Sequence, residues 1–157
     1  MLKEKAAYYY GELGKNCAEG LLLAANDVYH LNLTQDEILL FAGFGGGMGC
    51  GSTCGSLSGA IGGLSRLYGT REDFRALCAE FVDVFRRELG CGSIDCAPLA
   101  AKYKNEETRC TAAVMLTAQA LEKFIARLES KAAASAPAEG CTLSPEDIKR
   151  VKGMGFL

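Results

Sequence analysis

The sequence predicts an all-α fold, a single-domain helical bundle of about five to six helices with a Gly-rich loop. Three observations predict it. Apolar residues recur at helical spacing in most segments, N-cap residues precede those segments, and no segment shows the alternating pattern of a strand. With 157 residues, of which 49% are hydrophobic, the chain is about one domain long and can bury a core.

Polar residues mark where the expected helices begin. Asn16 followed by Glu19, and Thr34 followed by Glu37, each match a capping box. Asn105 is the expected cap of the last long helix. The expected helices cover about residues 2–13, 17–29, 35–42, 54–68, 70–90 and 105–131.

A Gly-rich segment interrupts this pattern. Residues 44–51 contain five glycines in eight positions, which predicts a loop because glycine weakens a helix. Ser52 or Thr53 is the expected cap of the helix that follows. Within that helix Gly55, Gly59 and Gly63 recur every four residues, so another backbone can approach closely and the helix is expected to be central.

The later part of the chain divides at an Ala/Ser/Pro segment. Residues 91–104, which contain Pro98, are expected to be irregular. Residues 1–131 are expected to form the helical redox domain, and 132–157 a linker and a short C-terminal helix that begins near Ser144.

The charge and hydropathy of the chain exclude some functions. A net charge of -2 and a pI of about 5.5 argue against nucleic-acid binding, which needs a basic surface. The N-terminal residues lack the apolar stretch of a signal peptide. The longest uncharged stretch, residues 38–65, contains the Gly-rich loop and is therefore not expected to span a membrane. We expect a cytoplasmic location.

Eight cysteines are many for a chain in a reducing compartment, where metal binding or thiol redox chemistry is the better expectation. Cys17 follows the Asn16 cap, Cys54 lies in the first turn of its helix, and Cys110 lies just past the first turn of the last one. Cys96 lies in the segment before it. Helix N-termini favour thiolate over thiol. Cys78, mid-helix among apolar residues, is expected to be a core residue.

The available ligand types restrict the kind of site. His30 is the one histidine and is expected at the surface or at a helix C-cap. No CxxC or CxxCH sequence occurs, which argues against a thioredoxin-type site and excludes covalent haem. An all-sulfur site suits an iron–sulfur cluster, or zinc held by four thiolates. The loop from Gly45 to Gly51 either donates N–H groups to sulfur or is a tight turn between helices. Each of the arginines Arg66, Arg71 and Arg109 either offsets the charge of a cluster or is a surface residue.

Several of these segments, in this order, resemble the redox-active family named after its C-GCAxxG-C-C pattern, also described by a CGAxxG motif. The resemblance covers about residues 5–128 and is carried by residues 16–19, 43–49, 54–60, 67–69, 92–96 and 110–114. It implies that the four characteristic cysteines are Cys17, Cys54, Cys96 and Cys110. If the Gly-rich loop donates N–H groups to sulfur, Gly46 and Gly47 are expected beside the cofactor. Ser56 stands where the motif has Ala. A sulfur-based redox role follows from the resemblance, without a substrate.

Three functions are therefore expected, in decreasing order of preference. The first is an iron–sulfur cluster bound by Cys17, Cys54, Cys96 and Cys110 for electron transfer with a donor or acceptor protein. The second is a thiol–disulfide oxidoreductase or redox sensor in which Cys54 attacks and Cys50 or Cys17 resolves. The third is a structural zinc module or a helical interaction domain.

Some assignments stay open from the sequence. An oxidoreductase is the candidate enzyme class, and a homodimer through exposed glycine or apolar surface is open as well. The remaining cysteines have no assigned role. Two of them are near enough in sequence to be alternative ligands or resolving thiols, and a third is close to the C-terminus: Cys50, Cys91 and Cys141.

Overall fold

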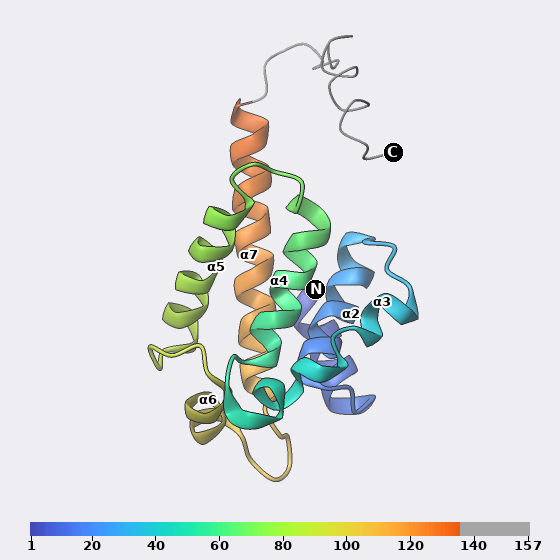
Figure 1. The fold of residues 1–157 in the computed structure, drawn as a ribbon, viewed down its shortest axis with the longest axis vertical. Helices are drawn as coiled ribbons and strands as arrows, with labels where there is room; N and C mark the ends of the chain where they lie inside the picture. Colours follow the sequence, from blue (N-terminus) through green and yellow to red (C-terminus); the bar gives the residue numbers. More distant parts are fainter. Residues whose placement is uncertain (136–157) are drawn as a thin grey trace. The chain divides into compact units, whose positions relative to one another are not determined.

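Seven α-helices make up most of residues 1–135, the part of the chain that this computed structural model describes (Figure 1). No strand occurs among those residues, only two isolated bridges, so the expected all-α class is confirmed. The expected count of five to six helices is too low. The helices are α1 (Leu2–Ala7), α2 (Cys17–Tyr29), α3 (Gln35–Leu39), α4 (Gly55–Tyr68), α5 (Phe74–Leu89), α6 (Cys96–Tyr103) and α7 (Thr111–Ser135).

Three short turns join these helices. A π-helical turn, Tyr8–Glu12, extends α1, so that the expected first helix is nearly complete. The third expected helix is shorter than predicted, because α3 ends at Leu39 and a 3-10 turn, Ala42–Phe44, follows it. The Gly-rich loop contains a turn at Gly47–Gly51 whose backbone has positive φ angles, which glycine adopts without strain.

Asn16 and Thr34 both cap their helices as predicted, but only one of the two expected capping boxes is complete. The Asn16 side-chain oxygen accepts hydrogen bonds from the N–H groups of Ala18 (2.8 Å) and Glu19 (3.0 Å). Thr34 and Glu37 form a complete capping box. At Asn16 the box is incomplete, since Glu19 accepts from the Asn16 side-chain amide and not from its backbone N–H.

The glycine stripe of α4 packs against α2. A Cβ atom at Gly59 would lie 2.4 Å from the carbonyl oxygen of Ala18, and one at Gly63 would lie 3.3 Å from Ala25 Cβ. Only glycine permits the closer of these approaches. The helix α4 contacts both α2 and α5, as Figure 1 shows, so it holds the central position that the sequence predicts.

Large apolar side chains of α5 and α7 fill the core beside α4. Phe81 and Phe85 on α5 and Leu121 on α7 are fully buried, and the rings of Phe81 and Phe124 meet edge to face with 5.2 Å between centroids. Burial of each such side chain contributes about 1.5–3 kcal/mol to folding. The helix α5 ends at Gly90, which has the left-handed conformation common at a helix C-terminus.

The segment before α7 differs from the prediction in two ways. Residues 96–103 form the helix α6 and are not irregular, because Pro98 lies in the first turn, where its missing N–H would have no helical partner. Asn105 does not begin the last helix. Its side chain accepts from Thr108 N (2.7 Å), and its backbone exchanges two hydrogen bonds with Arg109, so it closes a turn instead. The helix α7 starts at Thr111.

The described residues belong to two units, 1–126 and, from Arg127, a second unit of which the structure describes the last turns of α7. A single domain is therefore not confirmed. Most of the expected linker, the helix near Ser144 and Cys141 lie outside the described residues. No helix within residues 1–135 has the length and apolar character needed to cross a membrane.

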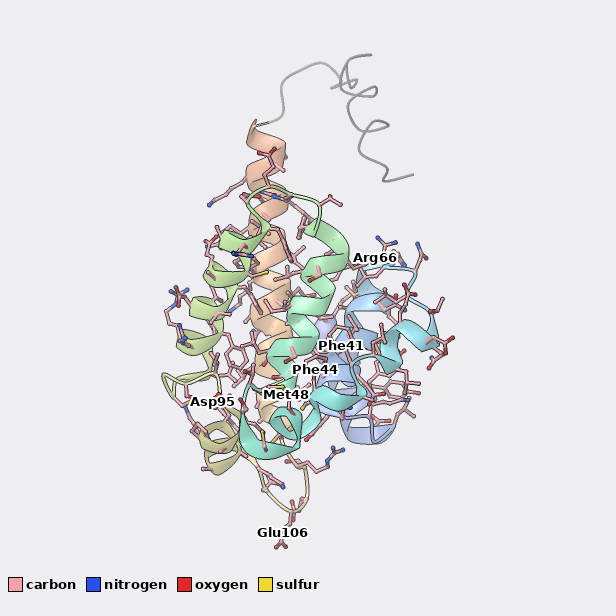
Figure 2. The ribbon with its side chains drawn as sticks, in the orientation of Figure 1. Phe41, Phe44, Met48, Arg66, Asp95 and Glu106 are labelled. Carbon is pink, nitrogen blue, oxygen red and sulfur yellow. The ribbon has the colours of Figure 1, made fainter. Side chains whose placement is uncertain are left out.

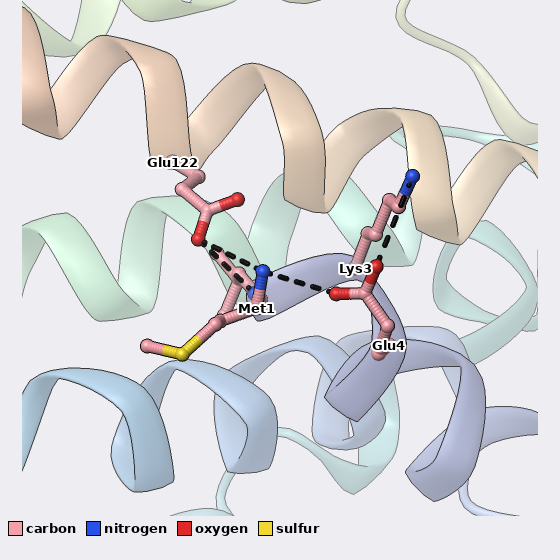
Figure 3. A network of polar contacts seen from close by, with 5 residues as sticks. Met1, Lys3, Glu4 and Glu122 are labelled. Carbon is pink, nitrogen blue, oxygen red and sulfur yellow. Dashed lines mark hydrogen bonds and ion pairs between the residues drawn. The ribbon is translucent and has the colours of Figure 1, made fainter.

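Charged groups at the start of α1 connect it to α7 within the first unit. The amine of Met1 lies 3.0 Å from Glu4 and 3.3 Å from Glu122, and Leu2 N–H donates to the same Glu122 carboxylate (Figure 3). These groups are largely exposed, so solvent screens the ion pairs and they contribute little to stability.

Candidate functional site

Four helices begin at or next to a cysteine. Cys17 is the first residue of α2, Cys54 the N-cap of α4, and Cys96 the first residue of α6. Cys110 directly precedes α7, and its carbonyl accepts from the N–H of Val114 (3.1 Å). The first N–H groups of a helix lack intrahelical partners. Each sulfur is therefore close to backbone donors.

These four helix ends meet at one cavity of about 220 Å³ in the first unit. All four cysteines line it, together with Gly46. No His, Asp or Glu belongs to its lining, so sulfur is the main ligand type that the cavity offers. The remaining lining residues are Tyr10, Asn16, Gly45, Ser56, Leu99, Ala100, Lys104, Arg109, Ala113 and Val114.

Close backbone packing brings the cysteines together. The N–H of Cys96 donates to Ser52 O (2.6 Å) and that of Cys54 to Ile94 O (2.8 Å), which connects the segments before α6 and α4. Gly47, with φ of 61°, packs so tightly that a Cβ atom there would lie 2.6 Å from Cys96 Cβ. Gly47 thus supports the wall of the cavity, and Gly46 lines it.

Cys17 lies close to the start of α4. A Cβ atom at Gly55 would be only 2.4 Å from Cys17 Sγ, so the residue after Cys54 must be very small. Glycine at this position lets the sulfur of Cys17 lie beside the first turn of α4.

Burial governs the protonation of the cavity thiols in the metal-free protein. It raises the pKa of Cys54 and Cys110, and it raises the pKa of Cys96 to about 11, to which the neighbouring cavity thiols add. At these three positions burial outweighs the helix-terminus effect that the sequence predicted. These three thiols are therefore protonated near neutral pH, and a metal that binds them displaces protons.

Two cations and a tyrosine lie on the α6 and α7 side of the cavity. The Arg109 guanidinium lies 4.1 Å above the Tyr10 ring and donates to the Tyr10 carbonyl (3.1 Å). The Tyr10 hydroxyl accepts from the N–H of Cys110 (3.1 Å). Lys104 opposes the effect of burial on the pKa of Cys96 and Cys110.

Of the three arginines considered from the sequence, only Arg109 lines this cavity. Arg71 pairs with Asp73 (2.7 Å), and Arg66 lines a separate hollow beside Leu40. The sequence did not single out Lys104. The one sequence feature that could have indicated Lys104 is its position at the end of the segment that begins at Cys96.

A buried hydroxyl group adjoins the sulfur of Cys54, and a second buried hydroxyl group lies behind the first. Ser56 Oγ lies 3.2 Å from Cys54 Sγ and 2.9 Å from Thr117 Oγ1, which in turn donates to the carbonyl of Ala113 (2.8 Å). Thr117 gives no signal in the sequence, because one threonine in a largely apolar helix is unremarkable. The only sequence signal at Ser56 is its departure from the motif, which has Ala at this position.

The other described cysteines do not line the cavity. Cys50 is exposed and its sulfur donates to Gly47 O (3.4 Å), while the sulfur of Cys91 donates to Ser93 O (3.7 Å). Cys78 is half-buried on α5. His30 is the C-cap of α2, as expected.

The four thiols line one cavity, but they do not form a preformed metal site in this structure. Within residues 1–135 no group of three or more His, Cys, Asp or Glu side chains is arranged to hold a metal ion.

The described residues form an all-helical fold in which four cysteines, from four helix ends, line one cavity. The protein therefore belongs to the class whose candidate site is built from cysteine. The family model described as "putative redox-active protein (C_GCAxxG_C_C)" matches residues 15–124, well over half of the chain. The chain belongs to this family, as its resemblance indicated. No curated protein and no solved structure matches the chain.

Proposed function

We propose that this chain is a cysteine-based redox protein in which Cys17, Cys54, Cys96 and Cys110 bind an iron–sulfur cluster for electron transfer. One observation carries the proposal: these four thiols, from four helix ends, line a cavity whose lining contains no other strong metal ligand. An electron donor or acceptor protein is the partner that this role requires.

The surroundings of the four thiols support a bound anionic group. Lys104 and Arg109 line the cavity and offset the negative charge of coordinating thiolates. Backbone N–H groups at the helix starts and in the glycine loop can donate to sulfur. Such a cluster, when bound, supplies one-electron redox chemistry, and the chain's own residues bind it, orient it and restrict access of water.

The glycine loop also sets the distance between a bound group and the protein surface. Gly45 and Gly46 line the cavity, and their neighbours Phe44 and Met48 carry partly exposed apolar side chains (Figure 2). The loop therefore contributes residues both to the cavity lining and to the protein surface. We propose that electrons enter or leave on this side.

The test is the iron and acid-labile sulfide content, with a visible spectrum, of protein purified without oxygen. Wild type is expected to hold near-equal iron and sulfide. Cys54→Ser is expected to lose most of the iron, since it removes the most buried of the four thiols. Cys17→Ser, Cys96→Ser and Cys110→Ser should each lower the iron content.

Cys78→Ser is the matched control, because this thiol is half-buried on α5 and does not line the cavity. It should keep wild-type iron. Unchanged iron in Cys54→Ser would contradict the proposal, as would a colourless wild-type protein. Stoichiometric zinc that remains through redox cycling would instead indicate the structural zinc module.

A specific contact favours thiol–disulfide exchange as the second candidate. Cys17 Sγ lies against Gly55, the residue after Cys54, so this contact favours a disulfide between Cys17 and Cys54. The raised pKa of Cys54 makes it a slow attacking thiol, and Cys50, which does not line the cavity, is poorly placed to resolve. A Cys17–Cys54 disulfide found by peptide mass spectrometry in metal-free protein, together with absence of iron in wild type, would favour this function.

A further inference from the structure

Two buried hydroxyl groups connect the sulfur of Cys54 to the helix α7. Ser56 and Thr117 are buried polar side chains within the described residues, and each has no exposed surface. The distances along the chain of contacts are 3.2 Å from Cys54 Sγ to Ser56 Oγ and 2.9 Å from Ser56 Oγ to Thr117 Oγ1. Thr117 Oγ1 lies 2.8 Å from Ala113 O.

The direction of these hydrogen bonds follows from counting protons. A hydroxyl has one proton to donate. Thr117 donates its proton to the Ala113 carbonyl, so it accepts from Ser56. Ser56 has then used its own proton, so it accepts from the S–H of Cys54. In the thiol form the chain runs from Cys54 to Ser56, to Thr117 and to Ala113.

The hydrogen bonds among Cys54, Ser56 and Thr117 can also have the opposite donor–acceptor direction without leaving a buried atom unpaired. When Cys54 has no proton, Ser56 can turn its proton to the sulfur, and Thr117 can turn its proton to Ser56. The Ala113 carbonyl loses only the Thr117 hydroxyl, because the N–H four residues later in α7 still donates to it. Both directions therefore satisfy every buried polar group.

We propose that Ser56, backed by Thr117, is a positioning residue that keeps a hydroxyl hydrogen bonded to the sulfur of Cys54 both when this sulfur carries a proton and when it coordinates. This inference rests on the proposed function for its redox consequence. A donor to a coordinating sulfur stabilises the more negative, reduced state and raises the reduction potential. The pair Ser56–Thr117 thus tunes the site through Cys54.

The test compares two serine variants on the same helix. Ser56→Ala removes the hydroxyl that reaches the sulfur, whereas Ser58→Ala removes one that donates to the backbone carbonyl of Cys54 (3.4 Å). The CGAxxG motif has Ala at position 56, so this substitution suits the fold. Ser56→Ala is expected to keep its iron and shift the one-electron equilibrium toward oxidation about tenfold, or about 59 mV. Ser58→Ala should keep the wild-type potential.

A double variant tests whether Thr117 acts through Ser56. Thr117→Val keeps the shape of the side chain and removes the donor to Ser56. It should lower the potential by less than Ser56→Ala does, and Ser56→Ala/Thr117→Val should equal Ser56→Ala alone. Additive shifts would overturn the role of Thr117 as a support for Ser56.

A readout without metal separates this inference from the proposed function. In reduced, metal-free protein the Raman S–H stretching band of Cys54, assigned by its loss in Cys54→Ala, should move toward that of an unbonded thiol in Ser56→Ala. It should stay in place in Ser58→Ala. Absence of iron in wild type would refute the proposed function, and the band would still decide the hydroxyl contact. An unchanged band, or an unchanged potential in an iron-loaded Ser56→Ala protein, overturns the inference.

Discussion

The two sides of the cysteine cavity differ in the residues that surround their thiols. On the side of α2 and α4, Cys17 and Cys54 lie where backbones approach so closely that Gly55 and Gly59 have no room for a Cβ atom. On the side of α6 and α7, Cys96 and Cys110 lie beside the cations Lys104 and Arg109. The first side contributes no charged side chain to the cavity lining, whereas the second contributes two cations. Substitutions on the two sides should therefore differ in kind, the first acting on folding and the second on the electrostatics of the site.

Gly59→Ala should have the largest effect on stability. The added Cβ would lie 2.4 Å from the Ala18 carbonyl oxygen, and backbone at this contact cannot move without separating α2 from α4. We expect a loss of about 1–3 kcal/mol in the free energy of unfolding, despite the better helix propensity of alanine. Denaturant unfolding of the reduced, metal-free protein measures it.

Gly43→Ala is the matched control for this packing. A Cβ atom at Gly43 meets nothing within 4 Å. Its free energy of unfolding should stay within about 0.5 kcal/mol of wild type. Equal losses in the two variants would contradict the view that close packing holds the α2 and α4 side together.

On the α6 and α7 side, we expect a thiol to make the free energy of unfolding depend on pH. Burial, with the neighbouring thiols, raises the pKa of Cys96 to about 11, so the folded metal-free protein holds this proton more tightly than the unfolded chain. Stability is then fully present below the ordinary thiol range, about pH 8.5, and falls as the pH rises through about 11. Urea unfolding at a series of alkaline pH values measures the slope.

Cys96→Ser should lessen this alkaline loss. Part of the slope should remain, since burial also raises the pKa of Cys54 and Cys110. An identical slope in the variant and in wild type would show that Cys96 titrates in the folded protein as it does in the unfolded chain.

Lys104→Gln should have the smallest effect. Lys104 lines the cavity but is largely exposed, so solvent and salt screen its charge. In iron-loaded protein we expect a slightly lower reduction potential, with a difference that shrinks as the ionic strength rises. Lys123→Gln, which removes the same charge from an exposed position of α7 outside the cavity lining, should leave the potential unchanged. A salt-independent shift would contradict a purely electrostatic role.

Several local signals in the sequence predicted local structure, although the expected cap at Ser52 or Thr53 is wrong, because Cys54 is the N-cap of α4. The caps at Asn16 and Thr34 depend on side chains within three residues, and both form. The glycine stripe of α4 predicted a close helix contact, which α2 supplies. The sequence does not predict the helix α6, because Pro98 interrupts its helical pattern, although proline is tolerated in a first turn.

Contacts between distant residues explain what the sequence did not predict. Asn105 looks like a helix cap, but the left-handed Arg109 turns the chain back onto it before α7 begins. Thr117 reaches Ser56 across 61 positions of sequence, and Tyr10 reaches Cys110 across 100. No pattern within a short window of sequence contains such pairs. The four cavity cysteines were named by their motif, whereas the groups that surround their sulfurs required the fold.

The distribution of the cavity over four helix starts has a consequence for biosynthesis. The cavity wall includes Cys17 near one end of the chain and Cys110 at the start of α7, so it is incomplete until nearly all of the first unit has left the ribosome. A group that fills this cavity must therefore bind after most of the first unit has been synthesised. It then connects helices that are far apart in sequence. Its binding free energy then adds to the stability of the whole unit and not to one segment. Nascent chains that end before α7 should accordingly retain none of the bound group.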